Sequence, residues 1–93
     1  MTSRELKEFC LADSRLRSAW LDAYDAGLEL ATVRARIGFA RHAGRTPDPD
    51  DEALEQFHAT RFSELRQDLA DRTHAIGLQT DPLTVDELVE LVT

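Results

Sequence analysis

Residues 50–76 form the longest stretch of the chain with one consistent helical period, and this stretch constrains the fold most strongly. Its apolar side chains recur three or four residues apart, which places them on one face of a helix. Those side chains are Leu54, Phe57, Phe62, Leu65, Leu69 and Ile76. Pro47 and Pro49 prevent a helix from entering from upstream, and Gly77 can end the helix as a C′ glycine. The pattern predicts one helix over about residues 50–76, whose apolar face the other segments must cover.

Shorter helical segments are expected upstream of this helix. A possible break at Asp13 and Ser14 leaves open whether residues 3–26 form one helix or two. Gly27 interrupts the apolar pattern, so that we expect a separate helical segment over about residues 30–43. Trp20 is expected to be the main apolar anchor of the N-terminal half.

Two capping boxes mark the starts of the first and last helices. In such a box a hydroxyl and a carboxylate three residues apart each accept a hydrogen bond from the other residue's backbone N–H. The two pairs are Thr2–Glu5 and Thr84–Glu87. The last helix spans only about nine residues, which is too short to persist alone. It must therefore dock on the rest of the chain or on a partner.

The fold class follows from these periods. No segment shows the period-two alternation of a strand, and no internal repeat is convincing. A chain of 93 residues is large enough for one modest core. The sequence predicts an all-α fold, with a single helical domain over residues 1–93. We expect a small bundle of four or five helices built around the long helix at about residues 50–76.

Composition suggests a cytoplasmic protein from a bacterium. Hydrophobic residues make up 42% of the chain and charged residues 31%, as in ordinary folded proteins. Neither an apolar run long enough for a membrane span nor a secretory signal pattern is present, so that no membrane partner is expected. The single cysteine, Cys10, excludes an internal disulfide. Lys7 is the only lysine among 11 basic residues, and GC-rich coding produces such an arginine bias.

The net charge of −7 is distributed unevenly. Residues 1–46 contain eight basic and six acidic side chains, whereas residues 47–93 contain three basic and twelve acidic ones. Such a chain can pair its own halves, pair with a second copy, or present an acidic face to a basic partner. The simplest interpretation is a solvated acidic surface, because exposed charge pairs contribute little to stability.

One candidate function is DNA binding through a helix-turn-helix. Ala23, Gly27 and Val33 resemble the alanine, the turn glycine and the inward valine of that motif. The second helix would then present a basic patch to phosphates or to another anion. This patch consists of Arg34, Arg36, Arg41 and Arg45. The net negative charge opposes DNA affinity, and Asp22 occupies a position that the motif normally buries, so that nucleic acid is a disfavoured partner.

A second candidate is a small enzyme. The run from Ile37 to Arg41, with Glu52 on the next helix, resembles part of an all-helical chorismate mutase over roughly 40 residues. The resemblance implies an active site in which Arg41 and Glu52 converge with further arginines around two substrate carboxylates. Leu30 and Val33, however, stand near the position of a catalytic arginine in that family. Because such catalysis depends on several preorganised cations, we expect no catalytic residues.

A metal site is a third candidate. Glu55 and His58 have the Glu-x-x-His spacing of di-iron helical bundles, and Asp71 and His74 repeat it. The two pairs lie sixteen residues apart, or about 24 Å along a helix, and no companion ligands are evident on another helix. Neither a metal nor a cofactor is therefore expected.

The remaining hypothesis is protein binding. Arginines lie on or beside the apolar stripe of the long helix, and burial of an arginine costs several kcal/mol unless it is paired. A protein interface can supply that pairing. The predicted interaction face consists of His58, Arg61, Phe62, Leu65, Leu69 and Arg72. In an antiparallel homodimer, Asp51, Glu55 and Asp68 of a second copy could reach the two arginines. We therefore predict a regulatory or protein–protein interaction module with an acidic C-terminal half, which binds itself and an unidentified protein.

Overall fold

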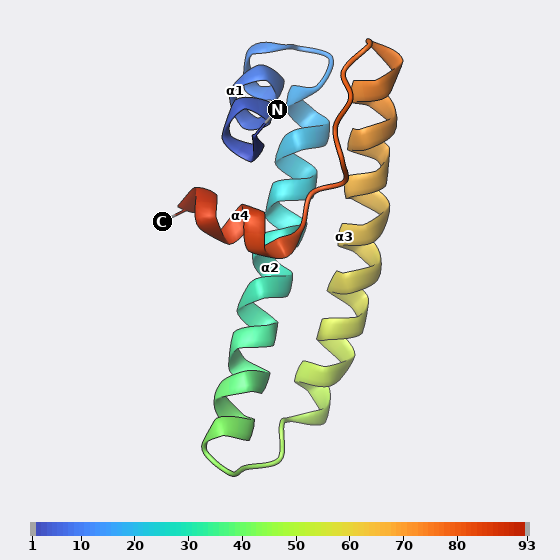
Figure 1. Ribbon diagram of the computed structural model, residues 1–93. Helices are drawn as coiled ribbons and strands as arrows, with labels where there is room; N and C mark the ends of the chain where they lie inside the picture. The colour runs from blue at the N-terminus through green and yellow to red at the C-terminus, as the bar shows by residue number, and fades with distance from the viewer. Residues whose placement is uncertain (1, 93) are drawn as a thin grey trace.

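The computed structural model describes residues 2–92, and within that range the chain forms four α-helices and no strand (Figure 1). The helices are α1 (Ser3–Ala12), α2 (Arg17–His42), α3 (Pro49–Ala75) and α4 (Val85–Val92). The molecule is 47 Å long, close to the roughly 40 Å that a helix of the length of α3 spans. The predicted all-α class and the long helix near residues 50–76 are confirmed.

The fold is organised around two long helices rather than one. α2 and α3 have 26 and 27 residues and lie antiparallel as a hairpin joined by residues 43–48 (Figure 1). The expected interruption at Gly27 is wrong, because α2 continues through Gly27 to His42. Gly27 is buried where Leu88 of α4 and Phe62 of α3 approach the α2 backbone. The absence of a side chain there permits close packing, which offsets the intrinsic cost of glycine in a helix.

Local capping chemistry sets the starts of three helices. Both predicted capping boxes form. The Thr2 hydroxyl accepts a hydrogen bond from the Glu5 N–H at 3.1 Å, and the Thr84 hydroxyl accepts one from the Glu87 N–H at 3.2 Å. Asp48 caps α3, since its carboxylate accepts from a backbone N–H two residues further on at 2.8 Å. Each cap satisfies an N–H group that the helix itself leaves unpaired.

Glycines end both long helices. Gly44 after α2 and Gly77 after α3 have φ angles of 75° and 90°, a backbone conformation that residues other than glycine rarely adopt. The Arg45 N–H then donates to the Ala40 carbonyl at 2.8 Å, and the corresponding hydrogen bond after α3 is 3.0 Å long. These are Schellman motifs, which satisfy carbonyl groups at the helix end.

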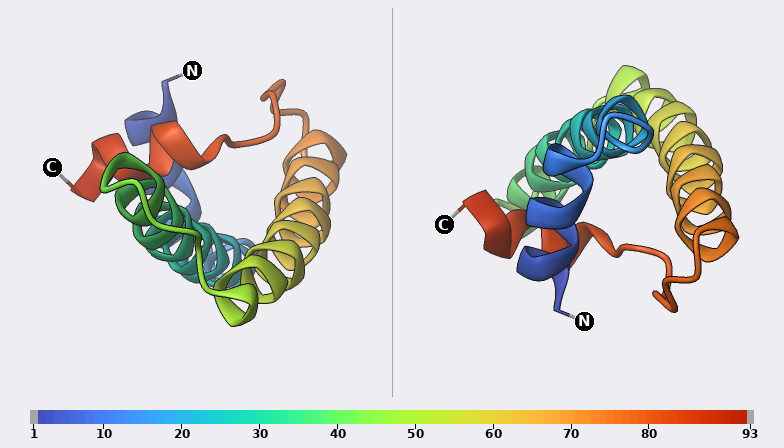
Figure 2. Two further views of the ribbon diagram at one scale, coloured as in Figure 1. Left: turned by 90° about the horizontal axis from the view of Figure 1, so that it is seen from below. Right: turned by 90° about the horizontal axis from the view of Figure 1, so that it is seen from above.

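The two short helices lie on the same side of the hairpin. α1 and α4 both pack against α2, and no other helix of residues 2–92 covers the opposite side (Figure 2). Of the two alternatives left open for residues 3–26, the structure has two helices, because the Asp13 carbonyl accepts from the N–H groups of Leu16 and Arg17 in a tight turn. After α3, residues 76–84 run back along the hairpin and place α4 across α2 (Figure 1).

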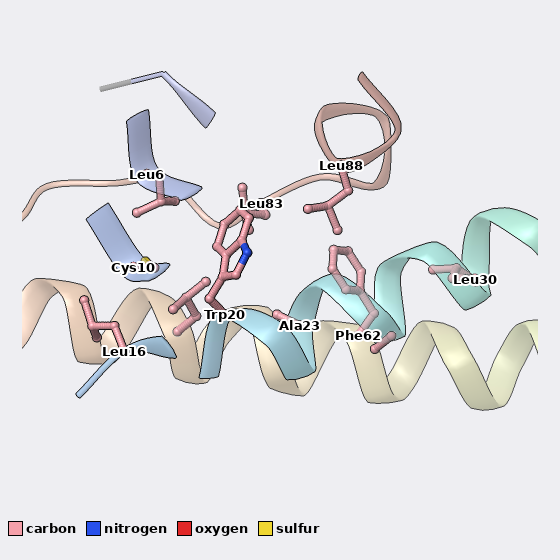
Figure 3. Close-up of a cluster of buried hydrophobic side chains, with 11 residues drawn as sticks. Leu6, Cys10, Leu16, Trp20, Ala23, Leu30, Phe62, Leu83 and Leu88 are labelled. Carbon is pink, nitrogen blue, oxygen red and sulfur yellow. The ribbon is translucent and has the colours of Figure 1, made fainter. Parts of the chain in front are cut away.

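The main hydrophobic core lies between α1, α4, residues 76–84 and the adjoining half of the hairpin (Figure 3). Trp20 is 1% exposed, and its ring centroid lies 6.2 Å from that of Tyr24. The buried side chains around it are Leu6, Cys10, Leu16, Ala23, Ala26, Leu30, Phe62, Leu69, Leu83 and Leu88. Every helix contributes to this cluster, and the expected role of Trp20 as an apolar anchor is confirmed by its burial.

The buried face of α3 differs from the predicted stripe. Phe62 and Leu69 are buried, but Leu54 and Phe57 are 41% and 62% exposed. Thr73, which no apolar pattern includes, is fully buried, and its hydroxyl donates to a backbone carbonyl of its own helix at 2.9 Å. α2 is the only helix of residues 2–92 that α3 contacts, and the half with Leu54 and Phe57 lies away from residues 76–84 as well (Figure 1). A single neighbouring helix buries a narrower face than a full bundle does.

Candidate interaction surface

Two arginines of the predicted basic patch pair with acids of α3. Arg36 Nη2 donates to Asp51 Oδ1 at 3.0 Å, and Arg34 Nε lies 3.9 Å from Glu55 Oε2. The basic half and the acidic half of the chain therefore attract each other across the hairpin. Much of the patch's positive charge is compensated within the molecule, which weakens it as a phosphate-binding surface.

The remaining features of the DNA-binding and enzyme hypotheses are not assembled. The helix-turn-helix interpretation is wrong, because α2 has no turn at Gly27. Arg41 and Arg45 are exposed at the loop end of the hairpin and make no ion pair within residues 2–92. Glu52 is exposed as well. The enclosed convergence of Arg41 and Glu52 that a chorismate mutase would require is therefore not formed.

A charged cluster joins the middle of α2 to the middle of α3. Arg61 Nη1 donates to Glu29 Oε2 at 3.4 Å and lies 3.9 Å from Asp25 Oδ2. The same Glu29 oxygen lies 3.4 Å from His58 Nδ1. That nitrogen is shielded from solvent and makes no hydrogen bond with any residue that the structure describes. The 3.4 Å contact can form an ion pair with a protonated ring, although it lacks hydrogen-bond geometry.

The two arginines on the long helix have partners within the same chain. Arg61 contacts the acids of α2, and Arg72 Nε donates to Asp68 Oδ2 at 2.8 Å, one helical turn away. Their side chains are 37% and 55% exposed. The expectation that these arginines need a second copy for charge pairing is therefore wrong, because their guanidinium groups reach water and nearby carboxylates.

Two members of the predicted interaction face belong to the core instead. Phe62 and Leu69 are only 3% and 2% exposed, so that a partner cannot reach them. Leu65 is partly buried against the same core. These residues lie on the apolar face of α3, and that face packs against α2. A helix end at Gly27 would have left α2 too short to cover them.

The side of the hairpin opposite α1 and α4 carries apolar side chains that are exposed or, at Leu28, partly exposed, and we call it the outer face. Its apolar residues are Leu21, Leu28, Leu54 and Phe57. Leu21 and Phe57 are 48% and 62% exposed. Leu21, Leu28 and Ala35 recur every seven residues on α2, which is the spacing of a coiled-coil seam.

A shallow groove runs between the two helices on the outer face. It is lined by Leu28, Glu29, Thr32, Val33, Arg36, Leu54 and His58. Apolar side chains from both helices thus flank the charged cluster around Glu29. The sequence could have indicated the heptad spacing on α2, but the expected helix end at Gly27 divided the row.

The residues considered as metal ligands are engaged elsewhere. Glu55 and His58 each face a charged residue of α2, whereas Asp71 accepts a hydrogen bond from its own helix and His74 contacts a backbone carbonyl. Among residues 2–92, no group of three or more His, Cys, Asp or Glu side chains could hold a metal ion.

Cys10 has the environment of a core residue. It is fully buried, and burial together with the negative charge of Asp13 raises the pKa of its thiol to about 11. The reactive thiolate is therefore scarce near neutral pH. Asp13 itself accepts hydrogen bonds from the side chain and the backbone of Arg15, which lower the pKa of its carboxyl to about 2.

Two further properties of the chain are the capacity of its helices to span a membrane and its similarity to other proteins. None of the described helices combines the length and the hydropathy that a membrane span needs. Comparison with protein-family models, with curated proteins and with solved structures gave no match.

Proposed function

We propose that this chain is a protein-interaction module that self-associates through the outer face of the α2–α3 hairpin. The observation that carries the proposal is the groove in which Leu28 and Leu54 flank Glu29 and His58, on the side that α1 and α4 leave uncovered. Phe57, 62% exposed, lies beside it with its ring centroid 5.3 Å from that of His58. Contiguous exposed apolar side chains rimmed by charges are typical of protein-interaction sites.

The charges of the outer face favour a second copy as the occupant. α2 contributes the acids Asp25 and Glu29, whereas α3 contributes the cation Arg61. When two hairpins face each other across a two-fold axis parallel to their length, α2 of one copy lies opposite α3 of the other. Asp25, whose side chain is 65% exposed, then meets Arg61 of the second copy at the same level, and the reverse pair forms by symmetry.

The dimensions of the face set the expected affinity. The segment of α3 from Leu54 to Arg72 is about 27 Å long, and two adjacent helices are about 20 Å wide. These dimensions give the outer face a contact area on the order of 550 Å² per copy. Specific interfaces start near about 600 Å² per partner. The outer face therefore falls just below that range, which favours a weak dimer, and we expect dissociation in the micromolar range.

Sedimentation equilibrium of the full chain tests this proposal. The monomer mass is 10.5 kDa, and we expect a concentration-dependent approach to twice that mass. Leu54→Asp places a carboxylate in the groove and should abolish the dimer, while its circular-dichroism spectrum should remain helical because Leu54 is 41% exposed. Val92→Asp is the matched control, since Val92 is 58% exposed on α4 rather than on the hairpin.

Two results would contradict the proposal. A single 10.5 kDa species at every concentration up to about 1 mM would exclude self-association of useful strength. A dimer that persists in Leu54→Asp but is lost in Val92→Asp would show that copies associate through α4 instead of through the outer face.

A further inference from the structure

A second groove lies on the other side of the hairpin, and residues of α2, of α3 and of the first turn of α4 line it. Its volume is about 290 Å³. Leu30, Ala59 and Phe62 form an apolar floor. Arg34 of α2 and Arg66 of α3 stand at its rim. The groove is distinct from the outer face and plays no part in the proposed dimer.

Arg66 is held in position by two contacts. Its guanidinium carbon lies 5.6 Å from the centroid of the Phe62 ring, a cation–π arrangement, and its Nη1 donates to the Leu83 carbonyl at 3.1 Å. A guanidinium group has five N–H donors, so that these contacts leave several of them available. Within residues 2–92, Arg66 makes no ion pair with a carboxylate. The side chain is thus a positioned cation that forms no ion pair with any residue that the structure describes.

Arg34 adds a second cation from the facing helix. Its only ion pair within the described residues is the 3.9 Å contact with Glu55, and its side chain is half exposed. Ser63 brings a hydroxyl group to the groove, and Asp86 brings one carboxylate. Asp86 in the groove and Glu55 beside Arg34 balance the two arginines in charge, so that the groove offers guanidinium N–H donors rather than a net positive charge.

We propose that this groove binds a small organic acid with one carboxylate and a short apolar body. The carboxylate would accept hydrogen bonds from Arg66 and Arg34, because guanidinium groups match carboxylates in charge and geometry. The apolar body would cover Leu30, Ala59 and Phe62 and leave water. Asp86 disfavours a second negative charge on the ligand. The volume lies at the lower limit for ligand pockets, which excludes nucleotide-sized molecules.

Benzoate is a suitable probe, and two matched compounds separate its features. Benzamide has the same ring without the charge, and inorganic phosphate has the charge without the ring. In ¹⁵N–¹H NMR titrations of the full chain, we expect benzoate to shift the backbone amides of Ser63, Val85 and Asp86 in a saturable manner. Benzamide and phosphate should each bind at least about tenfold more weakly, since each lacks one of the two interactions.

Arg34→Gln tests the assignment without disturbing the fold, because this side chain is half exposed. The loss of one charge-assisted hydrogen bond should weaken benzoate binding about tenfold or more. Arg45→Gln is the control, since it removes the same charge from the hairpin loop and should leave affinity within about twofold. Absence of a saturable shift up to about 50 mM benzoate, or equal losses in both variants, would overturn the proposal. Equal binding of benzamide or of phosphate would overturn it as well.

Discussion

Substitution of Gly27 by alanine offers a sharp test of how α4 docks. In an ordinary helix interior, Gly→Ala stabilises by about 0.5–1 kcal/mol because it reduces the freedom of the unfolded chain. At Gly27, however, the added Cβ would overlap Leu88 Cδ1 and lie 3.0 Å from Phe62 Cε1. Leu88 is fully buried and Phe62 is 3% exposed, so that neither side chain can move freely.

The expected magnitude follows from these two opposing effects. Extra methyl groups in a packed core cost about 1–3 kcal/mol. Gly38 provides the matched control on the same helix, because a Cβ there meets nothing within 4 Å. Gly38→Ala should therefore raise the free energy of unfolding by about 0.5–1 kcal/mol. The free energy of unfolding of Gly27→Ala should be about 1–3 kcal/mol lower than that of Gly38→Ala. In a chain of this size, 1 kcal/mol changes Tm by about 4–8 °C.

Urea denaturation followed by circular dichroism measures the global effect. Because α4 has only eight residues, the clash can also be relieved when α4 leaves its site without unfolding of the hairpin. Amide hydrogen exchange along residues 85–92 detects that outcome. In a Leu88→Ala background only the contact with Phe62 remains, so that the stability deficit of Gly27→Ala relative to Gly38→Ala should become smaller.

The reasoning would be refuted by equal stabilisation from Gly27→Ala and Gly38→Ala in the wild-type background, without faster exchange in α4. Such a result would mean that α4 does not press against α2 at this position. The continuity of α2 through Gly27 would then need a different explanation.

Two further predictions concern the core. Trp20→Ala should cost about 3–5 kcal/mol in urea denaturation because the indole is 1% exposed, and a cost below 1 kcal/mol would show that Trp20 does not anchor this core. The pKa of the Cys10 thiol is raised from about 9 to about 11, so that the unfolded thiol ionises first and stability should fall as pH rises from 9 towards 11. Unfolding measured at both ends of this range should show a smaller decline for Cys10→Ala, and an equal decline would contradict the assignment.

The helix ends that depend on local chemistry were predictable from the sequence. Thr2 with Glu5 and Thr84 with Glu87 form hydrogen bonds within four consecutive residues, so that no knowledge of the fold is needed. Gly77 likewise ends α3 through contacts with the last turn of the same helix.

Gly27 shows where such local reasoning fails. The same residue type marks a helix end when φ is positive and a close approach when another element packs against the helix. The side chain that decides between these roles, Leu88, lies far away in the sequence. A helix end at Gly27 separates Leu21 from Leu28, and their seven-residue spacing then indicates no common helix face.

The candidate surface was predictable only in part, because it depends on the register of the hairpin. The opposite charges of the two halves indicated that they could attract each other, and Arg36 with Asp51 confirms that attraction. Which acid meets Arg61 depends instead on how far α2 is shifted along α3. Packing in the core sets that shift, and single-helix periodicity contains no information about it.

Other segments of the chain pack against only one end of the hairpin. Near residues 43–48, neither α1 nor α4 packs against α2 and α3 (Figure 1). Val33, Ile37 and Pro47 are buried there, and the nearby Arg36–Asp51 ion pair is partly exposed, so that it adds little stability. This tip should open locally at a lower free energy than the trunk around Trp20. The groove of Leu28 and Leu54 extends towards this tip. A second copy bound in the groove would therefore suppress local opening of the tip, and dissociation of that copy would restore it.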